Sequence, residues 1–385
     1  MTSQAAPNPF LEGSGQVRSL NRVRIAALPA GVADEGLVGE GGYSLLGARA
    51  FRELIVREAQ AVPEAATDVA AAVVASAQAQ AAGAPPPDAR AIVVAWFDDE
   101  CLRPLATRVA AAYGRRMGAL FAVLLQGTAA NRAARPEWED RHWACWRMIE
   151  GVEVGGGLLA GRTGEVALMS AREVLRRAGA GLRLELSRFG AFLPLVGLAR
   201  MLPAATEAAA LLDFGHMSVK RASATYQDGA LRGLRILDPA PAPCGGLVEH
   251  DLVLGDVRRR WEAMAALSID AWRQADHPGG AVPTVGLAVA TYLEAGQPPA
   301  GVDECYGNLR LLGPNLATFA AADLERQFGT ASRLALAQDG DAAAFAHAGA
   351  HRTAVVSFGT ALGIGFAPEE GWAWPLSASF EITTA

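Results

Sequence analysis

A run of residues suited to binding a phosphate and a metal ion, DFGHMSVK, occupies positions 213–220. It follows an apolar β-type run and predicts a β-hairpin. The carboxylate of Asp213 at the strand end can hold a hydrated magnesium ion, usually through waters. Gly215 lets the backbone approach a phosphate, to which Ser218 or the turn amides can donate hydrogen bonds. His216, inside the turn, either touches phosphate or substrate or only packs.

Lysine usage singles out Lys220, which is the only lysine among the 34 Lys and Arg residues of the chain. Its flexible ammonium group is a point charge that would lie near the same phosphates. A composition that uses arginine at every other basic position indicates a requirement for ammonium at this one. The alternative is a plain hairpin with an exposed lysine.

A second turn of the same kind is indicated at 359–365, GTALGIG, between two apolar β-type runs. Its glycines permit positive φ and a close approach of the backbone, so that amide groups can point at an anion. We expect Gly359, Thr360 and Gly363 to contact nucleotide phosphates. A structural glycine-rich hairpin is the alternative.

A triglycine, Gly155, Gly156 and Gly157, follows a predicted strand and is expected to open a helix. That geometry suits packing against a nucleotide, and the dipole at the helix N-terminus favours an anion there. The alternative is a tight turn from strand to helix that binds nothing.

An acidic segment, QDGD at 338–341, joins a predicted strand to an alanine-rich helix. A carboxylate at such a strand exit can accept a proton from a substrate hydroxyl, which makes Asp339 the candidate base. Asp339 and Asp341 can instead cap the helix.

Three amide side chains are candidates for hydrogen bonds to a sugar: Asn308, Asn315 and Gln338. Asn308 and Asn315 lie in the loop before a helix predicted at 318–328, where they can equally be surface-turn residues.

The elements that must position these residues follow a clear order in the second half of the chain. Three β-type runs lie within 208–239, and Asp228-Gly229 between the last two is a tight-hairpin signal. Alternating helices and strands are then predicted, at 254–275, 282–293, 318–328, 333–338 and from 341. The order βββαβαβα predicts a mixed sheet with added helices.

The remaining segments predict a second copy of this pattern that is closed from both ends of the chain. Its strands are expected at 151–157, 182–187 and 354–366, with further strands at 372–382 and at 16–28. Its helices are expected at 43–62, 64–82, 98–126 and 164–179, with a Pro-rich loop at 84–89 and a closing helix at 190–202. We therefore predict an α/β fold of two lobes, 1–203 plus 353–385 and 204–352.

The composition is that of a globular protein, with 385 residues, 51% hydrophobic and 19% charged. The net charge of −6 gives no electrostatic reason to expect a nucleic-acid partner. No apolar stretch is long enough to predict a membrane helix, and the N-terminus lacks the basic segment followed by an apolar one that marks a secretory signal. We therefore expect a cytoplasmic protein without a membrane partner. The four cysteines are widely spaced and are expected to be reduced. They are Cys101, Cys145, Cys244 and Cys305.

Taken together, these motifs resemble the actin/hexokinase/heat-shock-protein ATPase superfamily, whose lobes have a ribonuclease H-like fold. The segments at 213–220 and 359–365 look like its two phosphate loops, and 154–157 looks like its adenosine loop. Within the superfamily, the ROK family of sugar kinases and repressors is most similar, because AQDGDAAAFAHA resembles its segment with the catalytic aspartate, which would be Asp339. The resemblance is patchy but spans most of residues 100–366.

The order of these loops differs from the family, in which the first phosphate loop comes early and the adenosine loop near the end. A circular permutation explains this difference. The ROK zinc motif is absent, and the family's Asn before the catalytic Asp is Gln338 here. These departures leave the identity of the sugar open.

The resemblance implies an ATP-dependent carbohydrate kinase that transfers the γ-phosphoryl group to a hydroxyl of a sugar or polyol. ATP and Mg²⁺ would be its cofactors, a small sugar its partner, and a homodimer is possible in view of its relatives. Two other functions stay open: an actin-like ATPase switch, and a non-catalytic regulator that binds sugar or nucleotide. A DNA-binding repressor is disfavoured, since residues 1–40 show neither a helix-turn-helix pattern nor basic charge.

Overall fold

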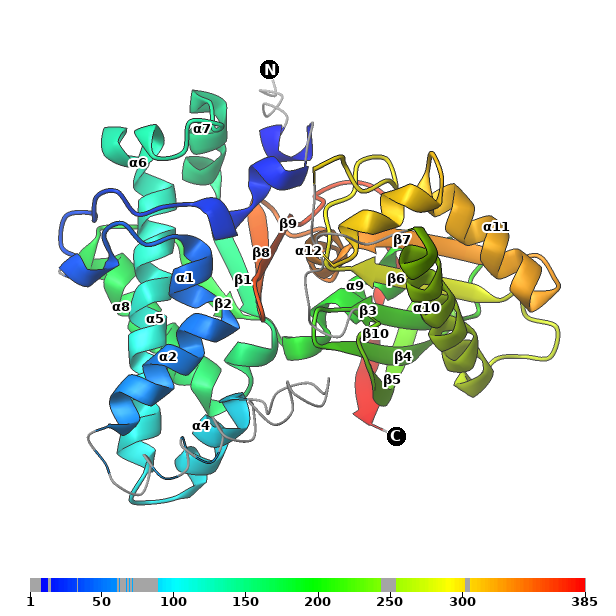
Figure 1. The fold of residues 1–385 in the computed structure, drawn as a ribbon, viewed down its shortest axis with the longest axis horizontal. Helices are drawn as coiled ribbons and strands as arrows, with labels where there is room; N and C mark the ends of the chain where they lie inside the picture. Colours follow the sequence, from blue (N-terminus) through cyan, green and yellow to red (C-terminus); the bar gives the residue numbers. More distant parts are fainter. Residues whose placement is uncertain are drawn as a thin grey trace. The chain divides into compact units, whose positions relative to one another are not determined.

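The computed structural model describes residues 8–12, 15–32, 34–60, 62, 67, 69, 71, 89–243, 254–301 and 305–384. The described chain is α/β and forms two compact units (Figure 1). The first unit contains the described residues up to 71, together with 89–190 and 351–363, and the second contains 191–350 and 364–384 where described. Cys244 and most of the segments predicted at 64–82 and 84–89 lie outside the described residues.

The first unit is rich in helices around a small sheet. Its helices are α1 (Gly42–Leu46), α2 (Ala48–Ala59), α4 (Ala89–Asp98), α5 (Arg103–Gln126), α6 (Ala129–Ala133), α7 (Asp140–Met148) and α8 (Arg162–Arg177). The strands of its sheet are β1 (Gly151–Gly155), β2 (Arg183–Leu186), β8 (Thr353–Phe358) and β9 (Leu362–Phe366), in the order β2-β1-β8-β9. Strand β9 passes from the first unit to the second after Gly363.

Three strands of the first sheet run parallel, although β8 comes from far along the chain. In the observed register, β1 pairs with both β2 and β8, and Gly151 lies opposite Arg183 and Thr353. The parallel direction brings the carboxyl ends of β1, β2 and β8 to one edge of the sheet. The turns that follow these strands, including the triglycine and Gly359, are therefore neighbours.

The strand predicted at 16–28 is wrong. This segment forms short 3-10 turns, η2 (Gly15–Arg18) and η3 (Leu20–Arg22), and then a single bridge between Arg24 and Gly41. The apolar residues of this segment are buried by irregular structure instead, with Leu20, Val23 and Ile25 almost inaccessible.

The second unit contains the larger sheet and confirms the predicted order βββαβαβα. Its elements in this order are β3 (Ala208–Phe214), β4 (Ser218–Gln227), β5 (Ala230–Pro241), α10 (Leu254–Gln274), β6 (Thr284–Val289), α11 (Leu316–Phe328), β7 (Arg333–Gln338) and α12 (Asp339–Phe345). Helix α9 (Leu193–Met201) precedes them, and strand β10 (Leu376–Thr384) follows.

The second sheet has the strand order β10-β5-β4-β3-β6-β7. Strands β3, β4 and β5 form an antiparallel meander, whereas β6 and β7 run parallel to β3. The hairpin predicted at Asp228-Gly229 is confirmed, since both residues turn the chain from β4 to β5 with positive φ.

One face of the second sheet packs against α10 and α11, and apolar residues at alternate strand positions build this core. The core contains Leu212, Phe214, Val285, Leu287, Val289, Trp261, Met264 and Leu316. Helix α9 contacts the other face, where Leu198 lies next to Gly286. Asp213 lies between Leu212 and Phe214 in β3, so it belongs to the α9 face.

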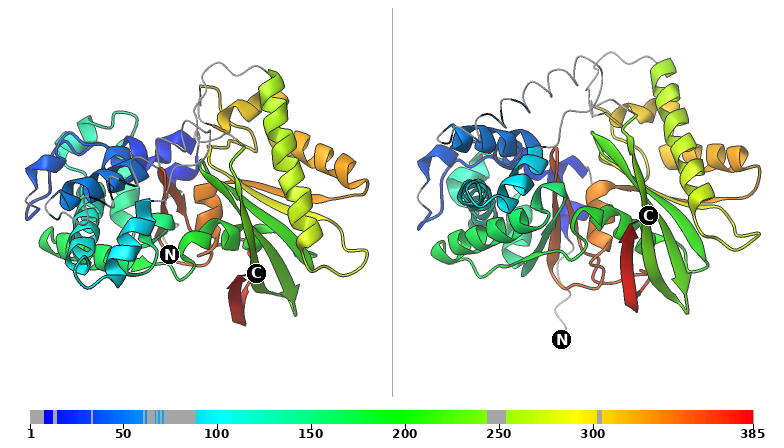
Figure 2. Two further views of the ribbon diagram at one scale, coloured as in Figure 1. Left: turned by 60° about the horizontal axis from the view of Figure 1, so that its bottom comes forward. Right: turned by 90° about the horizontal axis from the view of Figure 1, so that it is seen from below.

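The C-terminal strand corrects the predicted division of the chain. We expected 372–382 to extend the first sheet, but β10 pairs in parallel with β5 at the edge of the second sheet (Figure 2). Helix α9, within the closing helix predicted at 190–202, also belongs to the second unit. The expected lobes were 1–203 plus 353–385, and 204–352. The observed units differ from them because α9 and β10 both belong to the second unit, where β10 pairs with β5.

Two further observations bear on the expected environment of the protein. None of the described helices combines the length and the apolar character needed to cross a membrane. Cys101 and Cys145 carry free thiols as predicted. Cys305 is disulfide-bonded, so the expectation of reduced cysteines is wrong at this position.

Candidate functional site

Asp213 and Lys220 lie opposite each other in the β3–β4 ladder of the second unit. The Lys220 Nζ atom is 2.7 Å from Asp213 Oδ2, with 5% of the Asp213 side chain exposed and 35% of the Lys220 side chain. A carboxylate this deeply buried needs a cation, and Lys220 supplies it. The two residues were predicted to act on a magnesium ion and on phosphate, whereas the structure pairs them with each other.

The turn between these strands is compact. The Gly215 amide donates to the carbonyl oxygen of Asp213 at 3.1 Å and to that of Ser218 at 3.2 Å. Ser218, at the start of β4, is exposed. Burial lowers the pKa of His216 below its usual value, so its imidazole is neutral at neutral pH. The turn can thus offer backbone amides and the Ser218 hydroxyl to a phosphate, while the neutral His216 adds no positive charge to that of Lys220.

Asp339 begins α12 directly after β7. Its Oδ1 atom accepts a hydrogen bond from Gln338 Nε2 at 2.9 Å and one from the Gly340 amide at 2.7 Å. Gln338 itself is buried. These two donors fix the orientation of the Asp339 carboxylate, and they give Gln338 a role in the site that does not require contact with a sugar.

The sheet brings Asp213 and Asp339 to the same edge. Strands β3, β6 and β7 are parallel, with Asp213 opposite Ala288 and Ala288 opposite Ala337. Paired residues share a face of the sheet, so Asp213, Ala288 and Ala337 lie on one face. Asp339 follows the end of β7 as the first residue of α12. The two strand spacings between β3 and β7 amount to about 10 Å. Ala288 of β6 lies between β3 and β7 at this level and is fully buried.

The two asparagines predicted to contact a sugar are engaged within the chain. Asn315 is the N-cap of α11, where its Oδ1 accepts from the Thr318 amide at 2.9 Å, and its Nδ2 donates to Ala295 O at 2.8 Å. Asn308 is buried, and its Oδ1 accepts a hydrogen bond of 3.0 Å from Arg310 Nη1. Asn315 is therefore a structural turn residue, which was the alternative to contact with a sugar. Asn308 lies in the loop that follows β6, where it is hydrogen-bonded to Arg310.

In the first unit, the turn after β8 is held by the first residue of α2. The Ala48 amide donates to the carbonyl oxygens of Gly359 at 3.0 Å and Thr360 at 3.3 Å. In a trans peptide the carbonyl and the following amide point in opposite directions. The amides of Thr360 and Ala361 are therefore both turned away from Ala48.

These two amides form a candidate anion site. Neither the Thr360 nor the Ala361 amide donates a hydrogen bond to another described residue. Successive amides that point the same way attract an anion such as a phosphate. No sequence signal pointed to Ala48, because its contribution is a backbone group at a helix start far away in the chain.

The glycines of this turn play a different role from the expected one. Gly359, Gly363 and Gly365 all have ordinary φ values, so the predicted positive φ is wrong here. The close approach occurs within the protein, since a Cβ atom at Gly365 would lie 2.2 Å from Gly340 O. Gly365 is thus required by the helix that carries Asp339.

The triglycine also differs from its prediction. A 3-10 turn, η5 (Gly157–Leu159), follows it, and α8 begins only at Arg162, so the triglycine does not open that helix. Gly156 has φ +96°, and a Cβ atom there would lie 2.4 Å from Phe358 O. The glycine is needed where the chain leaves β1 against the end of β8.

The register of β1 and β8 nevertheless brings the two predicted nucleotide segments of this unit together. Gly155 lies opposite Ser357, which precedes the turn at Gly359 by two residues. Arg90 of α4 donates to Gly157 O at 3.3 Å and covers part of this edge. The triglycine and the two amides therefore share the carboxyl edge of the first sheet.

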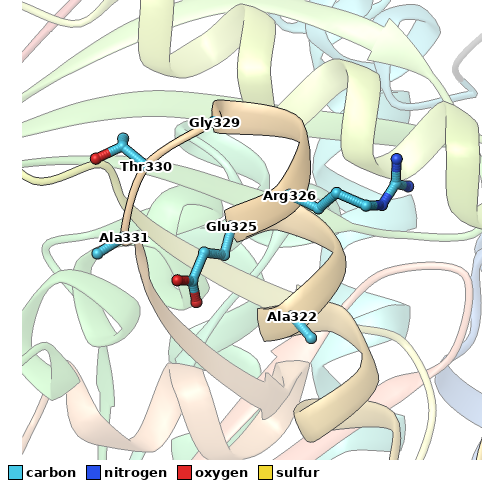
Figure 3. Close-up of a pocket in the computed structure, with 6 residues that line it drawn as sticks. All are labelled: Ala322, Glu325, Arg326, Gly329, Thr330 and Ala331. Carbon is cyan, nitrogen blue, oxygen red and sulfur yellow. The ribbon is translucent and has the colours of Figure 1, made fainter.

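A surface hollow in the second unit lies away from these residues (Figure 3). It is lined by Ala322, Glu325, Arg326, Gly329, Thr330 and Ala331, at the end of α11 and the start of the loop to β7. This is the amino end of β7, opposite the edge at which Asp339 lies, so the hollow is not part of the candidate site. Across the parts of the chain that the structure describes, no three His, Cys, Asp or Glu residues form a metal-binding group.

Comparison with known proteins adds no family assignment. No protein-family model matches the chain, and no curated protein matches it significantly.

Proposed function

We propose that this chain is an ATP-dependent carbohydrate kinase, which transfers the γ-phosphoryl group to a hydroxyl of a sugar or related polyol. The observation that carries the proposal is the placement of Asp213 and Asp339 at one edge of the second sheet, at the carboxyl ends of the parallel strands β3 and β7. A kinase of this kind needs one carboxylate near the phosphates and a second one at the acceptor hydroxyl.

In this proposal Asp339 orients the acceptor hydroxyl and accepts its proton. Its hydrogen bonds from Gln338 and the Gly340 amide hold the carboxylate in one orientation before the substrate arrives. Phosphoryl transfer needs little covalent help from the protein, so such positioning supplies most of the rate.

Lys220 and the turn amides would bind the phosphates. The Lys220 ammonium is partly exposed on a flexible stem, so it can turn from Asp213 towards a phosphate. Asp213 would then hold Mg²⁺ through water, which a single carboxylate can do when nucleotide phosphates supply other ligands. The ion would neutralise charge on the transferred group.

The proposed nucleotide-binding groups of the first unit are backbone amides and glycines. The amides of Thr360 and Ala361 suit a phosphate, and the neighbouring Gly155, Gly156 and Gly157 suit the adenosine part. Gly359 and Gly363 take part by forming the backbone of this turn.

The topology of the second unit supports the more specific proposal of an actin-like, ribonuclease H-like fold. Five of its strands lie in the order third, second, first, fourth, fifth, with the first three antiparallel. A circular permutation of a ROK-like kinase accounts for the position of β8 and β9 after this unit in the chain.

The first test is ATP consumption by the purified protein with magnesium and a panel of sugars and amino sugars. We expect one sugar to stimulate turnover, and Asp339→Asn to reduce it by about a thousandfold or more. Asp341→Asn is the matched control, because it also removes an acid from the first turn of α12.

The same assay separates the other two functions. ATP turnover that no sugar stimulates would favour an ATPase switch, and ATP binding without turnover would favour a regulator. Absence of ATP binding would rule out the nucleotide site and with it the kinase.

The single lysine offers a second test that needs no sugar. A lysine-reactive ATP acyl phosphate should label Lys220, and excess Mg-ATP should block the labelling. Lys220→Arg keeps the charge but removes the reactive amine, so it is the control. Labelling confined to the N-terminal amine would contradict a phosphate next to Lys220.

ATP, the proposed phosphoryl donor, agrees with the predicted cytoplasmic location. A small sugar is the proposed partner. The disulfide at Cys305 runs against this location, since a reducing cytosol keeps most thiols reduced. We retain the homodimer as a proposal that light scattering of the purified protein would test.

A further inference from the structure

Tyr306 connects the loop after β6 to the turn of the first hairpin. It immediately precedes the 3-10 helix η7 (Gly307–Leu312), and its side chain is fully buried. Its hydroxyl donates to the carbonyl oxygen of Gly215 at 3.0 Å. Its ring meets Phe214 edge to face, with the ring centroids 6.1 Å apart.

Two features keep this hydroxyl in place as a donor. Burial, with a smaller contribution from Asp213, raises the pKa of Tyr306 above its usual range, so the hydroxyl keeps its proton. The backbone beside it is anchored as well, because Arg260 of α10 donates through Nη1 to the carbonyl oxygen of Cys305 at 2.5 Å. Tyr306 thus holds the turn from a fixed position in the core.

The consequence for the turn follows from the planarity of the peptide. The Gly215 carbonyl and the His216 amide belong to one trans peptide and point in opposite directions. With the carbonyl held by Tyr306, the His216 amide is turned away from Tyr306. This amide donates no hydrogen bond to another described residue. The same arrangement occurs in the first unit, where Ala48 holds the carbonyls of Gly359 and Thr360.

We propose that Tyr306 is a positioning residue for nucleotide binding, which holds the Gly215 carbonyl so that the His216 amide donates to a phosphate of the bound nucleotide. The proposal rests on the proposed kinase function and adds to it a residue that contacts neither substrate. In the Tyr306→Phe variant the ring remains but the Gly215 peptide is released.

The test compares Tyr306→Phe with Tyr226→Phe and the wild type. Tyr226 is the matched control, because its hydroxyl also donates to a carbonyl, that of Ala199 at 2.8 Å, near the other end of β4. Isothermal titration with MgADP gives the affinity, and thermal unfolding gives the stability of each protein. We expect both variants to lose similar stability, whereas only Tyr306→Phe binds MgADP about three- to tenfold more weakly.

Equal MgADP affinity in Tyr306→Phe and Tyr226→Phe would overturn the proposal while leaving the kinase intact. A wild-type protein that does not bind MgADP would overturn both. If Tyr306→Phe does not fold, hydrogen exchange of the wild-type protein tests the proposal instead. Saturating MgADP should slow exchange of the His216 amide, and an unchanged rate would contradict its contact with phosphate.

Discussion

The pairing of Lys220 with Asp213 decides what a substitution at either residue does. Removing the ammonium leaves a carboxylate with only 5% of its side chain exposed and no cation beside it. Such a change costs about 3–5 kcal/mol of folding stability, apart from any effect on catalysis. Activity and stability must therefore be measured separately at this position.

We predict that Lys220→Met lowers both stability and turnover, and that adding Asp213→Asn restores stability alone. The second change removes the buried charge that the first left unpaired. Turnover should remain reduced by about a hundredfold or more, because the ammonium near the transferred phosphate and the proposed magnesium carboxylate of Asp213 are both missing. Thermal unfolding and steady-state kinetics of the two variants check this; recovery of turnover in the double variant would contradict a role for Lys220 at the phosphate.

At the scale of elements, two glutamates face each other across β1 and β2. Glu153 lies opposite Glu185 in the parallel register. Burial, together with the charge of Glu185, raises the pKa of Glu153 to about 7. The folded state therefore binds this proton more tightly than the unfolded chain, whose Glu has a value near 4.5.

The sign of the pH dependence follows directly. Between about pH 4.5 and 7 the folded protein keeps a proton that the unfolded chain has lost, so stability falls as the pH rises through this window. Allowing for solvent screening of a partly exposed group, we expect a loss of roughly 1–2 kcal/mol. Glu153→Gln should remove this slope in urea unfolding, and Glu185→Gln should move it to lower pH. The same slope in Glu153→Gln would assign it to another group.

Helices α9 and α12 also meet at element scale, with backbone against backbone. A Cβ atom at Gly197 would lie 1.5 Å from Ala342 O, in the helix that begins with Asp339. We predict that Gly197→Ala costs about 2–3 kcal/mol, because the helices must separate. Gly279→Ala is the control, since nothing lies within 4 Å of its Cβ position. Urea unfolding of both variants measures the difference, and equal stabilities would contradict the close contact.

At the scale of the whole molecule, the last strand of the chain belongs to the second sheet. Strand β10 covers the edge of β5, where Leu376 pairs with Leu231 and Ile382 pairs with Leu234. The strand therefore covers the edge of β5, a strand that begins more than a hundred residues earlier in the chain.

We predict that a chain ending at Pro375 unfolds at a lower temperature, through loss of β10 from the edge of the second sheet. Hydrogen exchange should become faster at 231–236 in β5, because these residues lose their partners in β10, and it should stay unchanged in β8. Faster exchange in β8 would instead support the predicted placement of this strand in the first sheet.

Local signals in the sequence were enough to define most elements. Apolar runs bounded by Gly, Pro and Asp marked β3 to β7, and the Asp228-Gly229 turn between β4 and β5 was identified from two residues. Asp213, Lys220 and Asp339 were selected by residue type and by position at strand ends. These signals are local, since propensity and hydrophobic period act over a few residues.

The tertiary structure decided which strands pair, and so which residues meet. Strand β10 could have extended either sheet, because its sequence carries no record of its neighbour. Gly156 was assigned to a ligand, although it is required by the backbone of another segment. The carbonyls of Gly359 and Gly215 are held by Ala48 and Tyr306, which are distant in sequence. Contacts between distant segments depend on the packing of the whole chain, so no local pattern could have indicated them.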